Sequence, residues 1–191
     1  TAGATRCIIG IGGSATNDGG FGMARALGWR FLKRDGNNIK RWPDLTSLHI
    51  IQPPKQRRLF NKLTVAVDVQ NPLLGRNGAS HVYGPQKGLQ STDIPLAEAA
   101  LRQLSKVWTK QNDCAAKLPG AGAAGGLGFG LHCFSGAKIK PGFGLFARMT
   151  KLPKLMREHD LAITGEGAMD RQTIMGKGVG ELAKMARECS C

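Results

Sequence analysis

The chain has 191 residues, of which 41% are hydrophobic and 21% are charged. A chain of this length and composition can bury a core, so we expect one domain or two small lobes and exclude an intrinsically disordered protein. The sequence contains neither an apolar run of about 18 residues nor a signal-peptide pattern, which predicts a cytoplasmic protein with no membrane partner.

The formal net charge of +14 raises the question of nucleic-acid binding. The basic residues are spread along the chain, and the densest runs, Lys33-Arg34 and residues 55–58, have no aromatic residues between them and match no nucleic-acid-binding motif. This distribution favours a solvated basic surface that attracts small anions over a nucleic-acid site. We therefore expect no nucleic-acid partner. A nucleic-acid-binding protein is kept as the least favoured of the functions that the sequence leaves open.

The cysteines and histidines do not form a metal or disulfide pattern. The five cysteines are odd in number, scattered and never spaced as C-x-x-C, and the four histidines show no H-x-x-x-H spacing. The sequence predicts reduced thiols and no histidine-bound metal.

The first motif is a strand, a glycine-rich loop and a helix. Residues 7–11, CIIGI, form a short β-branched run that predicts a buried parallel strand. GIGGSATNDGG follows, and apolar residues then recur at helical spacing over residues 20–33, with Asp18 as the expected cap. A helix start after such a loop presents free backbone N–H groups, which favours binding of a phosphate or carboxylate.

Three other interpretations of this loop are a dinucleotide site, a P-loop and a tight turn without a ligand. Gly10, Gly12 and Ala15 also fit G-x-G-x-x-A, and Asp35 follows at about the interval of a ribose-binding acid, but KRDGNN around Asp35 predicts a turn and not a strand end. No G-x-x-x-x-G-K-[ST] sequence occurs, which excludes a P-loop. A tight turn without a ligand is the remaining alternative.

The next segments predict a second strand and an exposed turn. Residues 63–75 alternate as a strand that stops at an Asn-Pro pair, with Asp68 at the end of the strand. GPQKG, residues 84–88, predicts a rigid turn that displays Gln86 and Lys87. Lys87 on such a turn is either solvated or binds an anion, and the sequence leaves both open.

A helix and a second glycine-rich segment follow. Residues 91–113 predict a scaffold helix with Asp93 and Pro95 as start signals. Residues 118–130 are rich in glycine and alanine but contain no serine, unlike a flexible linker, and they end in an apolar stretch typical of a helix. This composition predicts close backbone approach to a ligand or to a partner helix.

The last part of the chain repeats the pattern of strand, glycine turn and helix. Residues 159–188 predict a buried strand, a glycine turn that bears Glu166 and Asp170, and then Lys177 before a helix. Two acids and a lysine at the end of one strand suit a metal-bound polyphosphate.

Four blocks of the sequence together resemble the signature blocks of the glycerate kinase family. They are IIGIGGSATNDGGFGMARALG, DVQNPLLGRNGASHVYGPQKG, PGAGAAGGLGFGL with FSGAKIKPG, and ITGEGAMDRQT followed by GK. They stand in family order over nearly the whole chain. The resemblance implies a transferase that uses ATP and Mg²⁺ to move a γ-phosphoryl group to D-glycerate, giving 2-phosphoglycerate in this branch. The sequence does not decide the oligomeric state, and a homodimer is one possibility.

The resemblance also implies an α/β fold. A Rossmann-like, three-layer parallel-sheet domain, residues 1–30 and 155–191, would be interrupted by a second α/β domain, residues 31–154. The family's DSFK and DGGEGT motifs do not occur in this sequence, so the chain resembles the middle part of a kinase. A truncated, non-catalytic fragment that binds glycerate or nucleotide is therefore the second alternative. Ala168 and Gly144 also stand where the family commonly has a basic and an acidic residue.

The chemistry of phosphoryl transfer, together with the resemblance, suggests the site residues. Metal, lysine and backbone N–H groups must meet the charge on the phosphoryl oxygens. The acids are candidates for metal binding or for orienting the glycerate hydroxyl, and the lysines for neutralising phosphate. The expected catalytic residues are Asp68, Lys87, Glu166, Asp170 and Lys177; the substrate or nucleotide ligands are Gly12, Gly13, Ser14, Thr16, Asn17, Asn71, Gln86, Gly122 and Gly125; and the metal ligands are Asp18 and Asp170.

Overall fold

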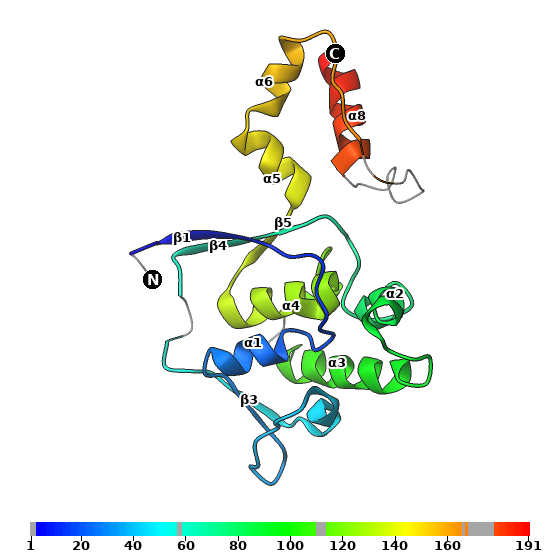
Figure 1. The fold of residues 1–191 in the computed structure, drawn as a ribbon. Helices are drawn as coiled ribbons and strands as arrows, with labels where there is room; N and C mark the ends of the chain where they lie inside the picture. Colours follow the sequence, from blue (N-terminus) through cyan, green and yellow to red (C-terminus); the bar gives the residue numbers. More distant parts are fainter. Residues whose placement is uncertain (1–2, 57–58, 110–113, 166, 168–177) are drawn as a thin grey trace.

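The computed structural model of the chain describes residues 3–56, 59–109, 114–165, 167 and 178–191. Its main sheet has three parallel strands in the order β1-β4-β5, with β1 at Arg6–Gly10, β4 at Lys62–Val67 and β5 at Lys138–Pro141 (Figure 1). Helices lie below this sheet in Figure 1, and the chain is an α/β protein as expected.

The strands predicted at residues 7–11 and in the first half of 63–75 are confirmed as β1 and β4, and they pair in parallel with Gly10 opposite Ala66. The expectation that β1 is buried is wrong. Ile8 is 50% exposed, because β1 is an edge strand of the described sheet and alternate side chains point away from the core.

The helix predicted over residues 20–33 is shorter than expected. Helix α1 spans Phe21–Ala26, and Gly28, with φ +86°, turns the chain into β2 at Arg30–Leu32, which pairs antiparallel with β3 at Ile50–Gln52. A glycine in the left-handed region ends a helix at little steric cost. Phe31 is buried, as the apolar spacing over residues 20–33 predicted, but it lies on strand β2 and not on the helix.

The remaining helices of the main body surround a core rich in aromatic residues. The rings of Trp29 and Phe134 lie 5.2 Å apart, and the indole N–H of Trp29 donates to the Phe134 carbonyl at 3.1 Å. The helix predicted at 91–113 is confirmed as α3. These elements are α2 at Ala79–Tyr83, α3 at Ile94–Thr109 and α4 at Ala123–Ser135, with short 3-10 helices η1 at Trp42–Ser47, η2 at Pro85–Lys87 and η3 at Ala115–Lys117.

The second glycine-rich segment packs against protein backbone. Ala124, Gly125 and Gly126 adopt left-handed φ values inside α4, and a Cβ on Gly125 would collide with the carbonyl oxygen of Thr16. A Cβ on Gly130 would lie 2.7 Å from the Cα of Gly20. These glycines therefore let α4 approach the first glycine-rich loop, which gives a structural reason for the composition of residues 118–130.

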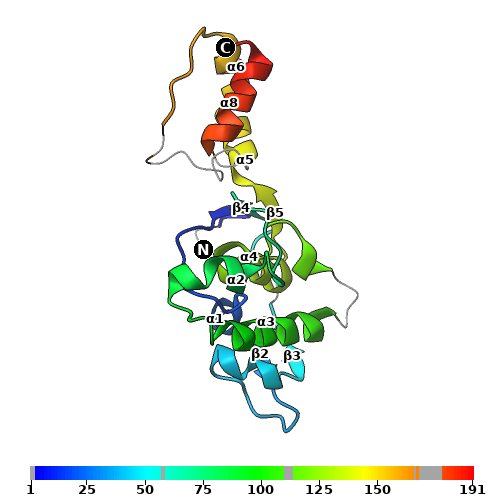
Figure 2. The ribbon, with the colours of Figure 1, turned by 90° about the vertical axis from the view of Figure 1, so that its right-hand side faces the viewer.

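Three helices stand apart from the main body beyond β5: α5 at Gly142–Met149, α6 at Leu152–Arg157 and α8 at Gly178–Cys189 (Figures 1 and 2). Helix α8 confirms the helix predicted at the end of the chain. The buried strand predicted just after residue 159 is wrong, since Leu161 and Ile163 are 73% and 89% exposed. Among the described residues, no strand lies beside this segment to pair with it.

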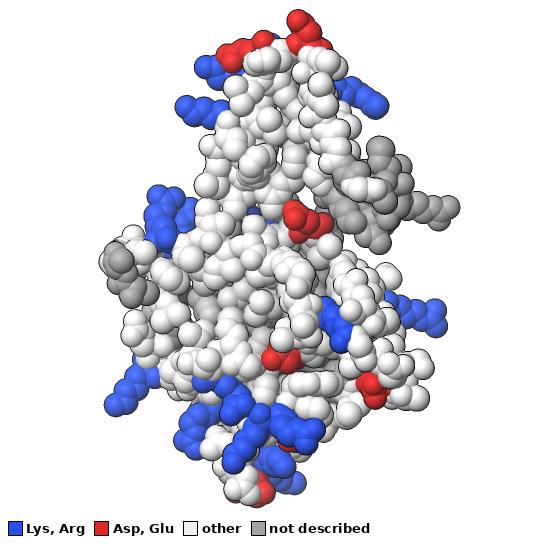
Figure 3. All heavy atoms as spheres, in the orientation of Figure 1, with Lys and Arg blue, Asp and Glu red and all other residues white. Residues whose placement is uncertain are grey.

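The division into a domain of residues 1–30 and 155–191 and a domain of residues 31–154 stays a prediction. The pairing of β1 with β4 crosses the predicted boundary at residue 30. In the described part of the chain, no helix is long and apolar enough to span a membrane. Basic side chains gather at the lower end of the face in Figure 3, the end at which Figure 1 places β3.

Candidate functional site

The loops that carry the predicted site begin at one edge of the main sheet. All three strands are parallel, so their carboxyl ends lie at the same edge, and the N–H of Ile11 still donates to the carbonyl of Ala66 at 3.3 Å just beyond β1. The glycine-rich loop follows β1, Asp68 follows β4, and Gly142 follows β5. This edge is where open parallel sheets bind their ligands.

Lys87 is the centre of the polar contacts at this edge. Its ammonium group donates to the hydroxyl of Ser14 at 2.8 Å and to the carbonyl of Thr16 at 2.7 Å. Burial lowers the pKa of Lys87, while the charge of nearby Asp18 acts in the opposite direction. Of the two options that the sequence left open, the structure excludes a freely solvated lysine.

Asp18 holds the start of α1. One of its carboxylate oxygens accepts the N–H of Gly20 at 3.0 Å, and the other accepts the N–H of Gly22 at 2.8 Å. The expected capping role is confirmed, because these N–H groups have no partner earlier in the helix.

Two polar pairs tie the loops after β1 and β4 to helix α2. Asn17 is buried, and its amide donates to the hydroxyl of Ser80 at 3.0 Å, while its Oδ1 atom has no partner among the described residues. The Tyr83 hydroxyl donates to Oδ1 of Asn71 at 2.6 Å. Burial raises the pKa of Tyr83, so it keeps its proton for this bond.

Ser80 and Tyr83 were missed by the sequence analysis. They lie three positions apart on α2, inside the second signature block, and Tyr83 is the only tyrosine of the chain. Their spacing on one face of a helix was the available signal, but the partners Asn17 and Asn71 lie in other segments.

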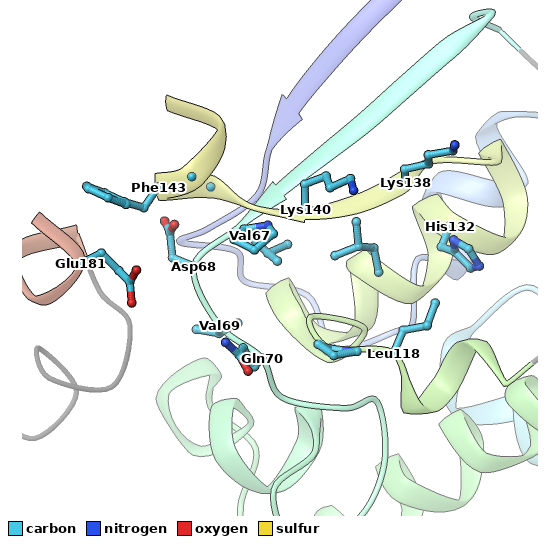
Figure 4. A pocket seen from close by; sticks show the side chains of 15 residues that line it. Val67, Asp68, Val69, Gln70, Leu118, His132, Lys138, Lys140, Phe143 and Glu181 are labelled. Atoms are coloured by element: carbon cyan, nitrogen blue, oxygen red, sulfur yellow. The ribbon is translucent and has the colours of Figure 1, made fainter. Parts of the chain in front are cut away.

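A cavity of about 840 Å³ opens beside the ends of β4 and β5. Figure 4 shows Asp68 at one end, with Glu181 reaching toward it from α8, and His132 and Lys138 at the other end. Glu181 was not predicted, because only the fold brings this residue of α8 to the cavity that Asp68 also lines.

The predicted glycine ligands fall into two groups: some have open space beside their backbone, and others pack against the backbone of other segments. Among the described residues, nothing lies within 4 Å of a Cβ built on Gly12 or Gly13, so these residues leave this backbone open to a ligand. Gly122 and Gly125 instead face the carbonyl oxygens of Pro72 and Thr16. Gln86 is exposed on η2. Glu166, Asp170 and Lys177 lie outside the described residues.

The described residues offer at most two carboxylates together to a metal ion, as at Asp68 and Glu181. No group of three or more His, Cys, Asp or Glu side chains gathers in the part of the chain that the structure describes. Mg²⁺ commonly takes only one or two carboxylates and fills its other positions with water and phosphate. Asp18 fits such a site as one ligand, since each of its oxygens accepts one N–H and keeps further acceptor capacity.

The family model described as the glycerate kinase family matches residues 1–191. The chain belongs to the glycerate kinase family. It is 46% identical over 190 residues to a glycerate kinase of Halalkalibacterium halodurans, covering 97% of this chain and 50% of that protein. It is 42% identical over 192 residues to the glycerate 2-kinase of Escherichia coli K12, covering 96% of this chain and 50% of that protein.

A solved structure also resembles the chain. The crystal structure of a protein assigned as glycerate kinase 2 from Salmonella typhimurium LT2 has a TM-score of 0.80 and 40% identity, and covers 98% of this chain and 51% of that one. The resemblance read from the four blocks is confirmed. The chain spans about half the length of the glycerate kinases that it matches.

Proposed function

We propose that this chain forms part of an enzyme that transfers the γ-phosphoryl group of ATP to D-glycerate, with 2-phosphoglycerate as the product. The observation that carries the proposal is the contact of Lys87 with Ser14 and Thr16, beside the open backbone of Gly12 and Gly13, in a chain of the glycerate kinase family. A lysine and free N–H groups at a sheet edge suit an acid or a phosphate.

In the proposed reaction, a glycerate hydroxyl oxygen attacks the γ-phosphorus, the bond from that phosphorus to ADP breaks, and the hydroxyl proton is lost. The charge in the transition state lies mainly on the phosphoryl oxygens, so the protein acts by positioning and by electrostatic stabilisation. Lys87 and the N–H groups of Gly12 and Gly13 would supply positive charge and hydrogen bonds, and Ser14, Thr16 and Asn17 would orient the acid.

The acidic residues have separate proposed roles. Asp68, at the end of β4, would accept a hydrogen bond from the glycerate hydroxyl and orient it. Asp18 and Asp170 would hold Mg²⁺, which when bound neutralises phosphate charge. Glu166 is a further candidate for metal binding or for orienting the glycerate hydroxyl, and Lys177 is a candidate second cation for phosphate.

A second candidate is a fragment that binds glycerate or nucleotide without turnover. The observation in its favour is that the chain spans about half the length of the relatives that it matches. Both candidates predict binding of glycerate, but only the first predicts ADP production.

A coupled assay of ADP release, with and without D-glycerate, separates the two candidates. We would assay the chain itself and a chimera in which it replaces the matching half of the Halalkalibacterium halodurans kinase, to which it is 46% identical. Glycerate-dependent ADP release by the chimera, lost in its Lys87→Met variant, supports the kinase. Glycerate binding without ADP release by either protein supports the fragment.

A further inference from the structure

A pocket of about 550 Å³ lies between α1 and β2, and we call it the α1–β2 pocket. Three basic side chains from different segments line it: Arg25 from the last turn of α1, Arg30 from the start of β2, and Lys40 from the segment that returns along β2. The return is fixed by the backbone, since the N–H of Ile39 donates to the carbonyl of Phe31 at 2.7 Å. The fold therefore brings three cations to one pocket.

Carboxylates do not neutralise these three cations within the part of the chain that the structure describes. There, no acidic residue lines the α1–β2 pocket, and none of the three basic side chains forms an ion pair. The one acid between Arg30 and Lys40 in the sequence is Asp35, whose carboxylate accepts the backbone and side-chain N–H groups of Asn37 at 3.0 and 2.9 Å. Figure 3 shows Lys and Arg side chains crowded at the lower end of the molecule, where Figure 2 places β2 and β3. An anion bound among like charges removes their repulsion.

The two arginines of the α1–β2 pocket are held in place by neutral partners. Nη1 of Arg25 donates to the carbonyl of Lys40 at 2.7 Å, and the guanidinium lies 5.4 Å from the centre of the Phe21 ring. Nε of Arg30 donates to Oδ1 of Asn38 at 3.4 Å. Each guanidinium carries more N–H donors than these bonds use. Ordered guanidinium groups with free donors are suited to bind a phosphate through pairs of parallel hydrogen bonds.

The base of the α1–β2 pocket is apolar. Trp29, Phe31 and Ile39 line it, with only 6%, 1% and 2% of their surfaces exposed, whereas the three basic residues are exposed at its rim. The volume lies within the range of about 300–1,000 Å³ that is usual for pockets that bind small organic molecules. The pocket therefore has room for an organic group beside a phosphate.

We infer that the α1–β2 pocket is a second anion site, which binds small organic molecules that carry a phosphate monoester. Arg25 and Arg30 would hold the phosphate oxygens, Lys40 would add a third positive charge, and the organic group would lie against Trp29. A small molecule is favoured over a nucleic acid because the cations converge on one pocket with an apolar base. The inference goes beyond the proposed kinase reaction and does not depend on it, since Lys87 does not line this pocket.

Isothermal titration calorimetry of the full chain with phenyl phosphate tests the inference. At about pH 7 a phosphate monoester carries about −1.5 to −2 charges. Arg25→Gln and Arg30→Gln should each weaken its binding by about tenfold or more, because each removes charge-assisted hydrogen bonds. Arg148→Gln, on the exposed side of α5, is the matched control and should leave the affinity unchanged. Lys87→Met should leave it unchanged as well.

Two further measurements complete the test. Phenyl sulfate has the same shape as phenyl phosphate but a single negative charge, so it should bind about tenfold more weakly. Circular dichroism shows whether each variant folds. Arg25 also bonds to the carbonyl of Lys40, so Arg30→Gln decides the test if Arg25→Gln does not fold.

Three results would overturn the inference. The first is no binding of phenyl phosphate, or an affinity that Arg30→Gln and Arg148→Gln change equally. The second is binding that is lost in Lys87→Met and kept in Arg30→Gln, which would place the probe at the proposed glycerate site. The third is a DNA duplex that displaces phenyl phosphate and binds more tightly, which would make this surface a nucleic-acid site. None of them bears on the proposed kinase, because ADP release by the chimera tests it separately.

Discussion

The ammonium group of Lys87 lies 2.8 Å from the hydroxyl of Ser14, although the two residues are 73 positions apart. The contact joins the 3-10 helix η2 to the glycine-rich loop after β1. A lysine on η2 thereby lies beside an open backbone that could receive an anion.

Replacing Lys87 by methionine removes the charge and keeps most of the apolar stem. We expect the affinity of the chain for D-glycerate, or kcat/KM in the chimera, to fall by about a hundredfold. This is the effect expected when one charged group that is oriented toward the ligand is removed. Titration calorimetry measures the first and the coupled assay the second. Lys106→Met is the control, and equal effects of the two substitutions would remove Lys87 from the site.

Glycerate binding should weaken as the pH rises through the lowered pKa of Lys87. The acid stays ionised over this range, whereas the lysine loses its charge below the ordinary pH of a lysine titration. Affinity measured from pH 7 upward should decline in the native chain, and the decline should move to higher pH in Lys87→Arg. A flat profile in the native chain would contradict this expectation.

The same lowered pKa predicts a pH dependence of stability. Between the folded pKa of Lys87 and its higher unfolded value, the unfolded chain binds more protons, so the contribution of this residue to the free energy of unfolding rises with pH. Urea denaturation at several alkaline pH values should show this rise relative to Lys87→Met. A difference that instead falls with pH in that window would contradict the direction of the shift.

Gly125→Ala should destabilise the chain by about 2–5 kcal/mol, since the new Cβ both strains a left-handed residue and collides with the carbonyl of Thr16. Gly144→Ala is the matched control. Among the described residues, its Cβ would have only Arg148 within 4 Å, at 3.8 Å, and alanine favours the helix, so the variant should be neutral or stabilising. Urea denaturation measures both, and a Gly125→Ala variant of native stability would refute the close packing of α4 on the first loop.

A double-mutant cycle tests the bond between Tyr83 and Asn71. Tyr83→Phe and Asn71→Ala should each destabilise the chain, and their coupling energy should be about 0.5–1.5 kcal/mol, as for one hydrogen bond. A coupling energy of zero from urea denaturation would show that the bond does not hold the loop after β4 to α2.

Local patterns in the sequence predicted the elements that depend on local contacts. The alternation at β4 and the apolar stripe of α3 identified a strand and a helix, and Asp18 was identified as a cap. The apolar spacing over residues 20–33 continued past Gly28 and so predicted too long a helix. Phe31 fits that helical spacing, but it is buried from strand β2.

The composition of the site depended on contacts between distant segments. The sequence marked Lys87 as a residue that could bind an anion, but not that it contacts Ser14, and it did not mark Tyr83 or Glu181 at all. The glycines of residues 118–130 were predicted to approach something closely, yet only the fold shows that Gly125 faces the backbone of Thr16.

The most direct test of the proposed anion site is a titration of the ¹⁵N-labelled chain with D-glycerate, followed by amide chemical shifts. If glycerate binds at this site, we expect saturable shifts at Gly12, Gly13 and Ser14 and at Lys87, and we expect these shifts to be lost in Lys87→Met. Saturable shifts confined to other parts of the chain, or no shifts at concentrations that support turnover by the chimera, would contradict the anion site.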